Sequence, residues 1–309
     1  MGNNAGAFSA KGSIICYNSI LTGNYVREGG ALYCLSTIEC YNCTFNNNTA
    51  QNSGGSLYCL AFVTCYNCTF NNNTAQNSGG AIYNKFDVKC INSTFTDNFA
   101  NGDGGAIFVS SNGDVVCGSN VSFVSNKASN GGAIYSSLFG IVEVSGSNVS
   151  FVNNFANDDG GAIYSVNGTV LIRGSNVSFV SNKASNGSAI YSYAPVVEVS
   201  GSNVSFVNNS AIFGGVIYSV NGTVLIKGSD VSFVSNKASN GAVIYSVHPY
   251  SPSSSMNVGV FNAIFIDNIA LLKGGAVIAN NNPSTTVVNC TFLGNHILMV
   301  QALFIKIVF

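Results

Sequence analysis

Hydrophobic and polar residues alternate along the chain in short runs that never extend into a helical spacing. Examples are Ala133-Ile134-Tyr135, Val142-Glu143-Val144 and Val149-Ser150-Phe151. Clusters of Gly, Ser, Asn and Asp, which are typical of turns, separate these runs. The pattern therefore predicts an all-β protein made of many short strands.

Two motifs recur along almost the whole chain. The first is Phe-x-x-Asn, which starts at Phe45, Phe70, Phe95, Phe123, Phe151, Phe179, Phe206, Phe233, Phe265 and Phe292. The second is Gly-Gly-Ala-Leu/Ile with small changes, which starts at Gly29, Gly54, Gly79, Gly104, Gly131, Gly160, Gly187, Gly214, Gly241 and Gly274. A degenerate first copy runs from Leu21 to Asn24. A self-similarity of this size indicates a repeat architecture, which folds as one elongated unit.

Each repeat of 25 to 28 residues has room for three short strands and three turns, which is one coil of a parallel β-helix. We expect about ten coils over residues 1–296, stacked about 4.8 Å apart. The Phe residues should fill the interior. An aliphatic ladder should do the same, namely Leu32, Leu57, Ile82, Ile107, Ile134, Ile163, Ile190, Ile217, Ile244 and Val277. Residues 297–309 are strongly apolar and are predicted to be a C-terminal cap or a truncated end.

The remaining positions of the two motifs suit the corners of a coil. Glycine allows a sharp corner that a Cβ would obstruct, and we assign this role to Gly79, Gly104, Gly131 and Gly160. Asparagine tolerates the left-handed turn conformation and can bond up the stack, and we assign this role to Asn98, Asn126, Asn154 and Asn182.

Charged residues make up only 7% of the chain, and the formal net charge is -1. With no basic stripe, nucleic acid is not an expected partner. We identify no secretory signal in Met1 to Ser13, and the 13 apolar residues of 297–309 are too few to span a bilayer as a helix. No transmembrane segment is expected in this chain.

The composite pattern F-x-x-N-x-A-x-x-x-G-G-A-(I/L)-Y, as in Phe70 to Tyr83, resembles the repeat of the chlamydial polymorphic membrane proteins. Related repeats occur in surface proteins of some protozoa. The resemblance covers roughly residues 15 to 296. It implies a right-handed β-helical passenger that is exposed at the cell surface and takes part in adhesion. Unlike that family, this sequence shows neither a signal peptide nor a C-terminal autotransporter barrel.

The cysteines form two Cys-x-x-Cys pairs, Cys40/Cys43 and Cys65/Cys68, which lie 25 residues apart. Such spacing can indicate zinc, but duplication of the repeat explains it here, so we expect no metal and no cofactor. Stacked coils would place these residues in ladders. Cys43 should face inward as a small hydrophobe. The stacking distance is compatible both with free thiols and with disulfides between neighbouring coils.

Parallel β-helices also include carbohydrate-active enzymes, which place carboxylates around one groove. The acidic candidates are Asp97, Asp103, Asp114, Glu143, Asp158, Asp159, Glu198, Asp230 and Asp267. Asp103 and Asp159 directly precede motif glycines, as turn residues do. Glu143 and Glu198 fall two coils apart, too far for a tight pair. His248 and His296 have no evident partner, so no catalytic residue is assigned.

An aromatic column follows the aliphatic ladder by one residue and should point outward by strict alternation. Its first members are Tyr33 and Tyr58, and its assigned binding residues are Tyr83, Phe108, Tyr135, Tyr164, Tyr191, Tyr218 and Tyr245. A flat aromatic strip could stack on sugars or on a protein partner. The alternative is that the rings merely cover the sheet against a neighbouring loop.

Together these features predict a right-handed single-stranded parallel β-helix that acts as a non-enzymatic adhesin-like module. We expect it at the cell surface or outer membrane, or secreted. The expected partner is a host-cell surface protein or glycan, with self-association also possible. A β-helical polysaccharide lyase or hydrolase and a purely structural spacer are the alternatives.

Overall fold

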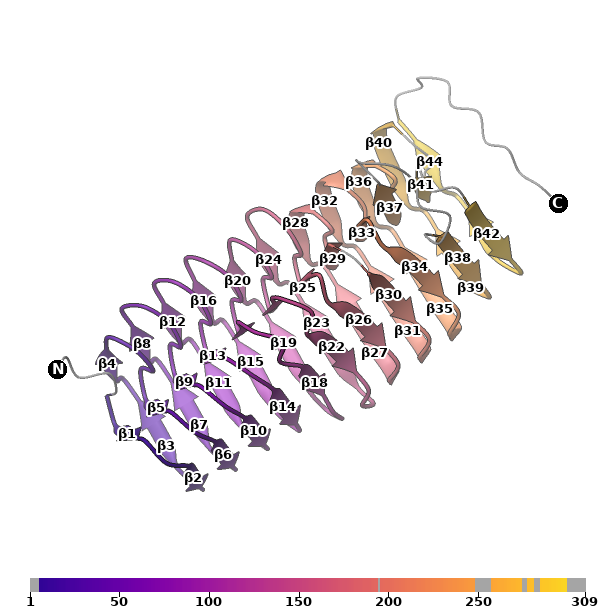
Figure 1. Cartoon of the computed structure of the whole chain (residues 1–309). Coiled ribbons are helices and arrows are strands. Elements are labelled where there is room, and N and C mark those ends of the chain that lie inside the picture. Colours follow the sequence, from indigo (N-terminus) through magenta and orange to yellow (C-terminus); the bar gives the residue numbers. More distant parts are fainter. Residues whose placement is uncertain (1–5, 194, 248–256, 274–276, 281–283, 299–309) are drawn as a thin grey trace.

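The fold is a straight stack of coils, and the first and last described strands lie at opposite ends of a rod (Figure 1). The computed structural model describes residues 6–193, 195–247, 257–273, 277–280 and 284–298. Within these ranges every regular element is a β-strand, and all paired strands are parallel. No helix in the described part of the chain is long and apolar enough to cross a membrane.

Four sheets of eleven strands run along the rod, and each coil contributes one strand to each sheet. Sheet A contains β1 (Phe8–Ala10), β5 (Leu32–Cys34), β9 (Leu57–Cys59), β13 (Ile82–Asn84), β17 (Ile107–Val109), β21 (Ile134–Ser136), β25 (Ile163–Val166), β29 (Ile190–Tyr193), β33 (Ile217–Val220), β37 (Ile244–Val247) and β41 (Ile278–Asn280). Sheet B contains β2 (Ile14–Tyr17), β6 (Ile38–Tyr41), β10 (Val63–Tyr66), β14 (Val88–Ile91), β18 (Val115–Cys117), β22 (Ile141–Val144), β26 (Thr169–Ile172), β30 (Val196–Val199), β34 (Thr223–Ile226), β38 (Asn257–Phe261) and β42 (Ser284–Val288).

The other two sheets begin at the Phe motif. Sheet C contains β3 (Ile20–Thr22), β7 (Thr44–Asn46), β11 (Thr69–Asn71), β15 (Thr94–Thr96), β19 (Ser122–Val124), β23 (Val149–Val152), β27 (Ser175–Val180), β31 (Ser202–Val207), β35 (Ser229–Val234), β39 (Ala263–Ile266) and β43 (Thr291–Leu293). Sheet D contains β4 (Tyr25–Val26), β8 (Thr49–Ala50), β12 (Thr74–Ala75), β16 (Phe99–Ala100), β20 (Lys127–Ala128), β24 (Phe155–Ala156), β28 (Lys183–Asn186), β32 (Ser210–Gly214), β36 (Lys237–Asn240), β40 (Ile269–Lys273) and β44 (His296–Ile297).

The predicted all-β parallel solenoid of about ten coils is confirmed, and the degenerate copy at Leu21 forms a coil as well. The prediction of three strands per coil is wrong, because the coil has four. The fourth strand is as short as Thr49–Ala50. Two residues are too few to show a hydrophobic alternation in the sequence. The right-handed sense of the coil stays a prediction.

The interior is filled by ladders of identical residues. Nine motif Phe residues, from Phe45 to Phe265, are fully buried, and neighbouring rings stack with centroids 4.7 to 5.1 Å apart. Burying each ring contributes about 1.5–3 kcal/mol. The aliphatic ladder is buried beside them, but its last member was predicted one residue too early. Ile278, not Val277, pairs with Ile244, because the sequence there reads Ala-Val-Ile rather than Ala-Ile.

The Asn residues of the first motif form a second interior ladder, which is polar. Asn126 is fully buried, and its Nδ2 donates to Phe95 O (2.9 Å) and to Asn154 Oδ1 (3.0 Å). Its backbone N–H donates to the same Oδ1 (3.0 Å). The left-handed conformation expected at these asparagines lies instead at the residue before, as at Ser125 (φ 55°) and Asn153 (φ 54°). The ladder therefore serves to pair buried polar groups, which would otherwise be costly.

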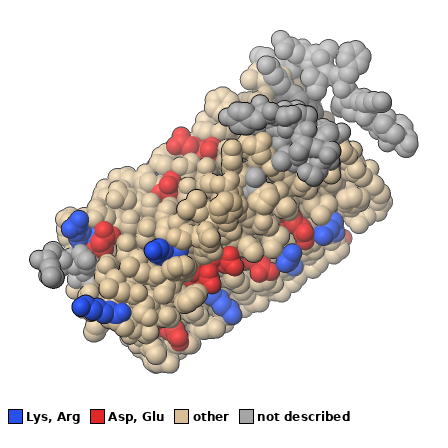
Figure 2. All heavy atoms as spheres, viewed as in Figure 1, with Lys and Arg blue, Asp and Glu red and all other residues tan. Residues whose placement is uncertain are grey.

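No Lys, Arg, Asp or Glu is buried in the described ranges, so the few charged groups lie on the outside, as Figure 2 illustrates for one face. His248 and residues 299–309, which include most of the predicted cap, lie outside the described residues, as does Gly274. The proposed division at residue 296 stays a prediction.

Candidate functional site: the tyrosine ladder

The predicted aromatic column lies on the outer face of sheet A, one residue after the buried aliphatic ladder in each coil. Its rings are half-buried from Tyr33 to Tyr245. From Tyr83 to Tyr245 the neighbouring ring centroids are 4.8 to 5.2 Å apart. All these pairs are close to parallel except Tyr218 and Tyr245, whose planes differ by 52°.

This stacking changes what the column can contact. Each ring face is covered by the ring of the next coil, so the column presents ring edges and hydroxyl groups to the outside. The expected flat strip on which a sugar could stack is therefore wrong in its geometry. A row of hydroxyls spaced by one coil, about 4.8 Å, can instead donate and accept hydrogen bonds.

A polar ladder lies beside the tyrosines, at the corner where sheet D leads into sheet A. It alternates carboxylates and amides: Asn130 Nδ2 donates to Asp103 Oδ1 (2.9 Å), and Asn186 Nδ2 donates to Asp159 Oδ1 (2.8 Å). Burial raises the pKa of both Asp103 and Asp159, and the amide hydrogen bonds oppose this shift. The two rows lie side by side over four coils, from Asp103 to Asn186, and together form a hydroxyl, carboxylate and amide surface there.

The hydroxyls of Tyr135, Tyr164 and Tyr191 are protonated at neutral pH. Burial raises the pKa of Tyr135 to about 12, and the Asp103 carboxylate adds to the shift. Burial also raises the pKa of Tyr164 and Tyr191, with smaller contributions from the neighbouring tyrosines and from Asp159. Each of these hydroxyls can therefore act as a hydrogen-bond donor across the physiological pH range.

The predicted corner glycines lie where sheet D turns into sheet A. Gly79, Gly104, Gly131 and Gly160 have φ between 60° and 69°, the left-handed region that favours glycine. A Cβ on Gly131 would also collide with Ile134 O. The predicted turn asparagines belong to the buried ladder and are not exposed at the surface, namely Asn98, Asn126, Asn154 and Asn182.

The cysteines line the interior. Cys43 is 1% exposed and faces inward as predicted, and Cys40 pairs in register with Cys16 and Cys65. All ten are free thiols in the structure. Within the described ranges no group of three or more His, Cys, Asp or Glu side chains is placed to hold a metal ion.

The two glutamates considered for catalysis are bound in an ion ladder on the outside of sheet B. Arg173 lies between them, 3.6 Å from Glu143 Oε1 and 3.7 Å from Glu198 Oε1, and Lys227 lies 3.4 Å from Glu198 Oε2. A hydrogen bond from Ser200, followed by the charges of Lys227 and Arg173, lowers the pKa of Glu198. This is the opposite of the shift that a general acid requires.

Two outer features escaped the sequence analysis. One is a second stacked ladder on sheet B, formed by Tyr17, Tyr41 and Tyr66, whose centroids are 4.9 and 5.2 Å apart. The other is a hollow at the corner between sheets B and C. Both leave a signal in the sequence: the recurring Cys-Tyr-Asn, and an abrupt loss of residues between aligned coils.

The fold and these surfaces define a class: a single-chain parallel β-solenoid whose repeats stack identical residues. Segments 42–60, 67–85, 92–110, 120–137 and 148–166 match the Chlamydia polymorphic membrane protein repeat. Each match begins at an outer Asn of a coil and runs through the Phe, the buried Asn and the Gly corner into sheet A.

Five segments between residues 42 and 166 therefore match this repeat, and the resemblance predicted from the motifs is confirmed over that part of the chain. A search of curated proteins and a search of solved structures each found no significant match.

Proposed function

We propose that the chain is a non-enzymatic adhesin-like module, exposed at a cell surface or secreted, that attaches to a host-cell surface protein or glycan. The observation that carries the proposal is the row of half-buried tyrosine hydroxyls beside the Asp103 to Asn186 ladder. A long array of identical hydrogen-bonding groups suits a repetitive or extended ligand, because each coil can repeat the same contact.

The family repeat supports a place at the cell surface, since the polymorphic membrane proteins are outer-membrane surface proteins. The pairing of Glu143 and Glu198 with Arg173 favours a non-enzymatic module over a carbohydrate-active enzyme. A structural spacer would need no exposed hydroxyl row. It remains the alternative that the experiment below addresses, together with self-association through the same face.

The test replaces hydroxyls without disturbing the stack. Phe108 already occupies the column, with centroids 5.2 and 5.0 Å from its neighbours, so phenylalanine fits there. The triple variant Y135F/Y164F/Y191F should lose at least about ten-fold in attachment to host cells, which corresponds to about 1.4 kcal/mol. The matched control is Y17F/Y41F/Y66F on sheet B, which should attach like the wild type.

Analytical ultracentrifugation measures the oligomeric state of the same proteins, so a loss of self-association can be told apart from a loss of cell attachment. Unchanged cell attachment by Y135F/Y164F/Y191F would reject the ladder as the contact surface. Equal losses in both triple variants would do the same, because they would point to a general effect of losing tyrosine hydroxyls.

A further inference from the structure

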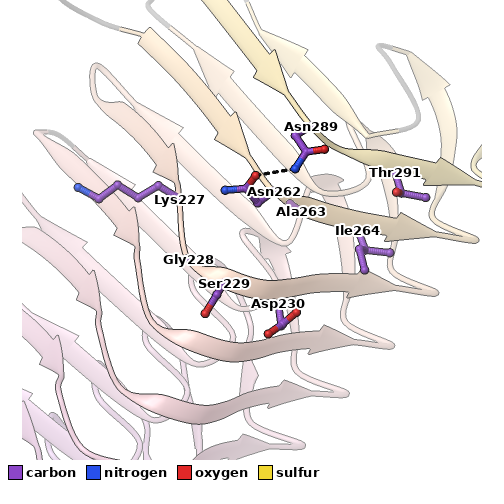
Figure 3. A pocket seen from close by; sticks show the side chains of 9 residues that line it. All are labelled: Lys227, Gly228, Ser229, Asp230, Asn262, Ala263, Ile264, Asn289 and Thr291. Carbon is purple, nitrogen blue, oxygen red and sulfur yellow. Dashed lines mark hydrogen bonds between the residues drawn. The ribbon is translucent and has the colours of Figure 1, made fainter.

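The corner between sheets B and C changes length along the rod, and it does so abruptly once. We count the residues between the sheet B position of Cys90 and the sheet C position of Thr94 in each coil. Three residues lie between them at 91–93, four at the equivalent segment 118–121 and five at 145–149. It is still five at 227–231 and then falls to three at 261–263. The longer corner projects beyond the shorter one, and a hollow of about 470 Å³ opens at this step (Figure 3).

An exposed asparagine ladder runs along this corner; among the described residues its hydrogen bonds are interrupted at the same place and also between Asn67 and Asn92. All eleven of its positions have positive φ: Asn18, Asn42, Asn67, Asn92, Asn120, Asn148, Asn176, Asn203, Asp230, Asn262 and Asn289. Where the ladder is bonded, the amide of one coil donates to Oδ1 of the coil before. Examples are Asn203 to Asn176 (2.8 Å) and Asn289 to Asn262 (2.9 Å).

Asp230 has no amide nitrogen to donate to Asn203. Within the described residues, no hydrogen bond joins Asp230 to Asn203 or to Asn262. The Asp230 carboxylate and the Asn262 Nδ2 thus reach the hollow without a protein partner. From Asn120 to Asn203, the side-chain amide of each rung donates to the rung of the coil before. In the described part of the chain, the Asp230 carboxylate and the Asn262 amide make no such bond to Asn203 or to each other, so both are available to a ligand.

The other lining residues define the ligand chemistry. Ser229 and Thr291 contribute hydroxyls, and the exposed side chain of Ile264 contributes a small apolar patch, whereas the Ala263 side chain faces the core. Lys227 and Asp230 bring opposite charges, and Lys227 is already 3.4 Å from Glu198. This balance favours neither a phosphate nor a cationic ligand. Mixed donors and acceptors around a small apolar patch match a neutral sugar ring, which has hydroxyls at its rim and C–H groups on its face.

We propose that this hollow binds one neutral sugar unit, with Asp230 and Asn262 as its main hydrogen-bonding groups. The inference rests on the proposed adhesin function only in the choice of ligand class. The hollow lies at a different corner from the tyrosine ladder, so the two surfaces can fail separately. Exposed and shallow sites of this kind bind single sugars weakly, in the range of about 1 mM.

The test is saturation-transfer NMR on the full chain with free glucose, galactose and N-acetylglucosamine, in buffer containing EDTA. The deciding variant is Asp230→Asn, which restores the residue found at the ladder's other rungs and should therefore fold. It should raise the dissociation constant of the bound sugar at least about ten-fold. The matched control Asn176→Asp makes the reverse charge change at a rung whose neighbouring corners have equal length and should bind like the wild type.

Three results would overturn the proposal: no sugar of the panel binding the wild type, Asp230→Asn binding as well as the wild type, or Asn176→Asp losing as much as Asp230→Asn. Binding that appears only when Ca²⁺ replaces EDTA would assign the hollow to a cation instead. Sugar binding by Y135F/Y164F/Y191F that persists after its cell attachment is lost would separate this site from the proposed attachment surface.

Discussion

Two asparagine ladders run the length of the solenoid, and they have the same residue type and spacing but different surroundings. In the interior ladder, the side chain of Asn154 takes part in four hydrogen bonds, two as acceptor and two as donor. In the exposed ladder, Asn148 donates to Asn120 and accepts from Asn176, each at 3.1 Å. Water can replace the second set of bonds but not the first. Stability therefore requires asparagine at the rungs of the interior ladder, whereas the exterior ladder accepts another residue, as it does at Asp230.

Removing one interior rung should have the largest effect. Asn154→Ala removes the acceptor of the buried Asn126 backbone N–H, and it also removes one hydrogen bond each from Asn126 Nδ2, Phe123 O and Asn182 Oδ1. An N–H left unpaired in the core costs about 1–3 kcal/mol and each further lost bond about 0.5–1.5 kcal/mol, so the free energy of unfolding should fall by about 2 kcal/mol or more. Denaturant unfolding followed by circular dichroism measures this loss. A loss below about 1 kcal/mol would mean that the interior amides contribute little.

A charge in the interior ladder should make stability depend on pH. In Asn154→Asp the buried carboxyl has a pKa above that of the unfolded chain, because burial disfavours the charged form. The variant is therefore destabilised at neutral pH and recovers as the pH falls from the raised pKa towards the unfolded value of about 3.9, because the neutral acid can donate a bond. Unfolding at pH 4 and pH 7 tests this. Asn148→Asp in the exposed ladder is the control and should show no such recovery.

The tyrosine ladder lies between these extremes, and alkaline pH should reveal it. Burial raises the pKa of Tyr58, Tyr135 and Tyr218 to about 12, above the unfolded value of about 10. Their contribution is complete below pH 10 and is lost as the pH rises from 10 towards 12. Y135F/Y164F/Y191F removes three ionisable groups of the column, so its stability should fall less than that of the wild type over this range. Parallel alkaline unfolding curves would contradict the assignment.

Changing one exterior rung should have the smallest effect. Asn148→Gly removes two exposed hydrogen bonds, and glycine accepts the left-handed conformation (φ 58°) without strain. The free energy of unfolding should fall by less than about 1 kcal/mol. A loss as large as that of Asn154→Ala would remove the distinction between the two ladders.

Much of this fold could be predicted from the sequence because stacking turns equivalent residues into ladders. The Phe and aliphatic ladders, the inward Cys43 and the outward tyrosines all follow from counting residues along the repeat. The fourth strand could not be predicted, because a pair such as Thr49–Ala50 has no measurable alternation. Val277 was assigned in place of Ile278 because a repeat with an inserted Val has two equally good alignments.

The candidate surfaces were less predictable. Alternation gives the side of the sheet on which Tyr135 lies, but not whether its ring faces the solvent or the next ring. That orientation depends on the 4.8 Å distance to Tyr164. The hollow beside Asp230 depends on a difference in corner length between two coils. This difference can be counted only when the strand pairing in both sheet B and sheet C is known.

The most direct test of the central claim is hydrogen exchange of asparagine side-chain amides, measured by NMR on the unmodified chain. If the interior ladder holds the coils together, the Nδ2 protons of Asn126, Asn154 and Asn182 exchange only through opening of the solenoid and persist long after transfer into D₂O. The Nδ2 protons of Asn120, Asn148 and Asn176 exchange within the first spectrum. Equal exchange rates in the two ladders would contradict the account.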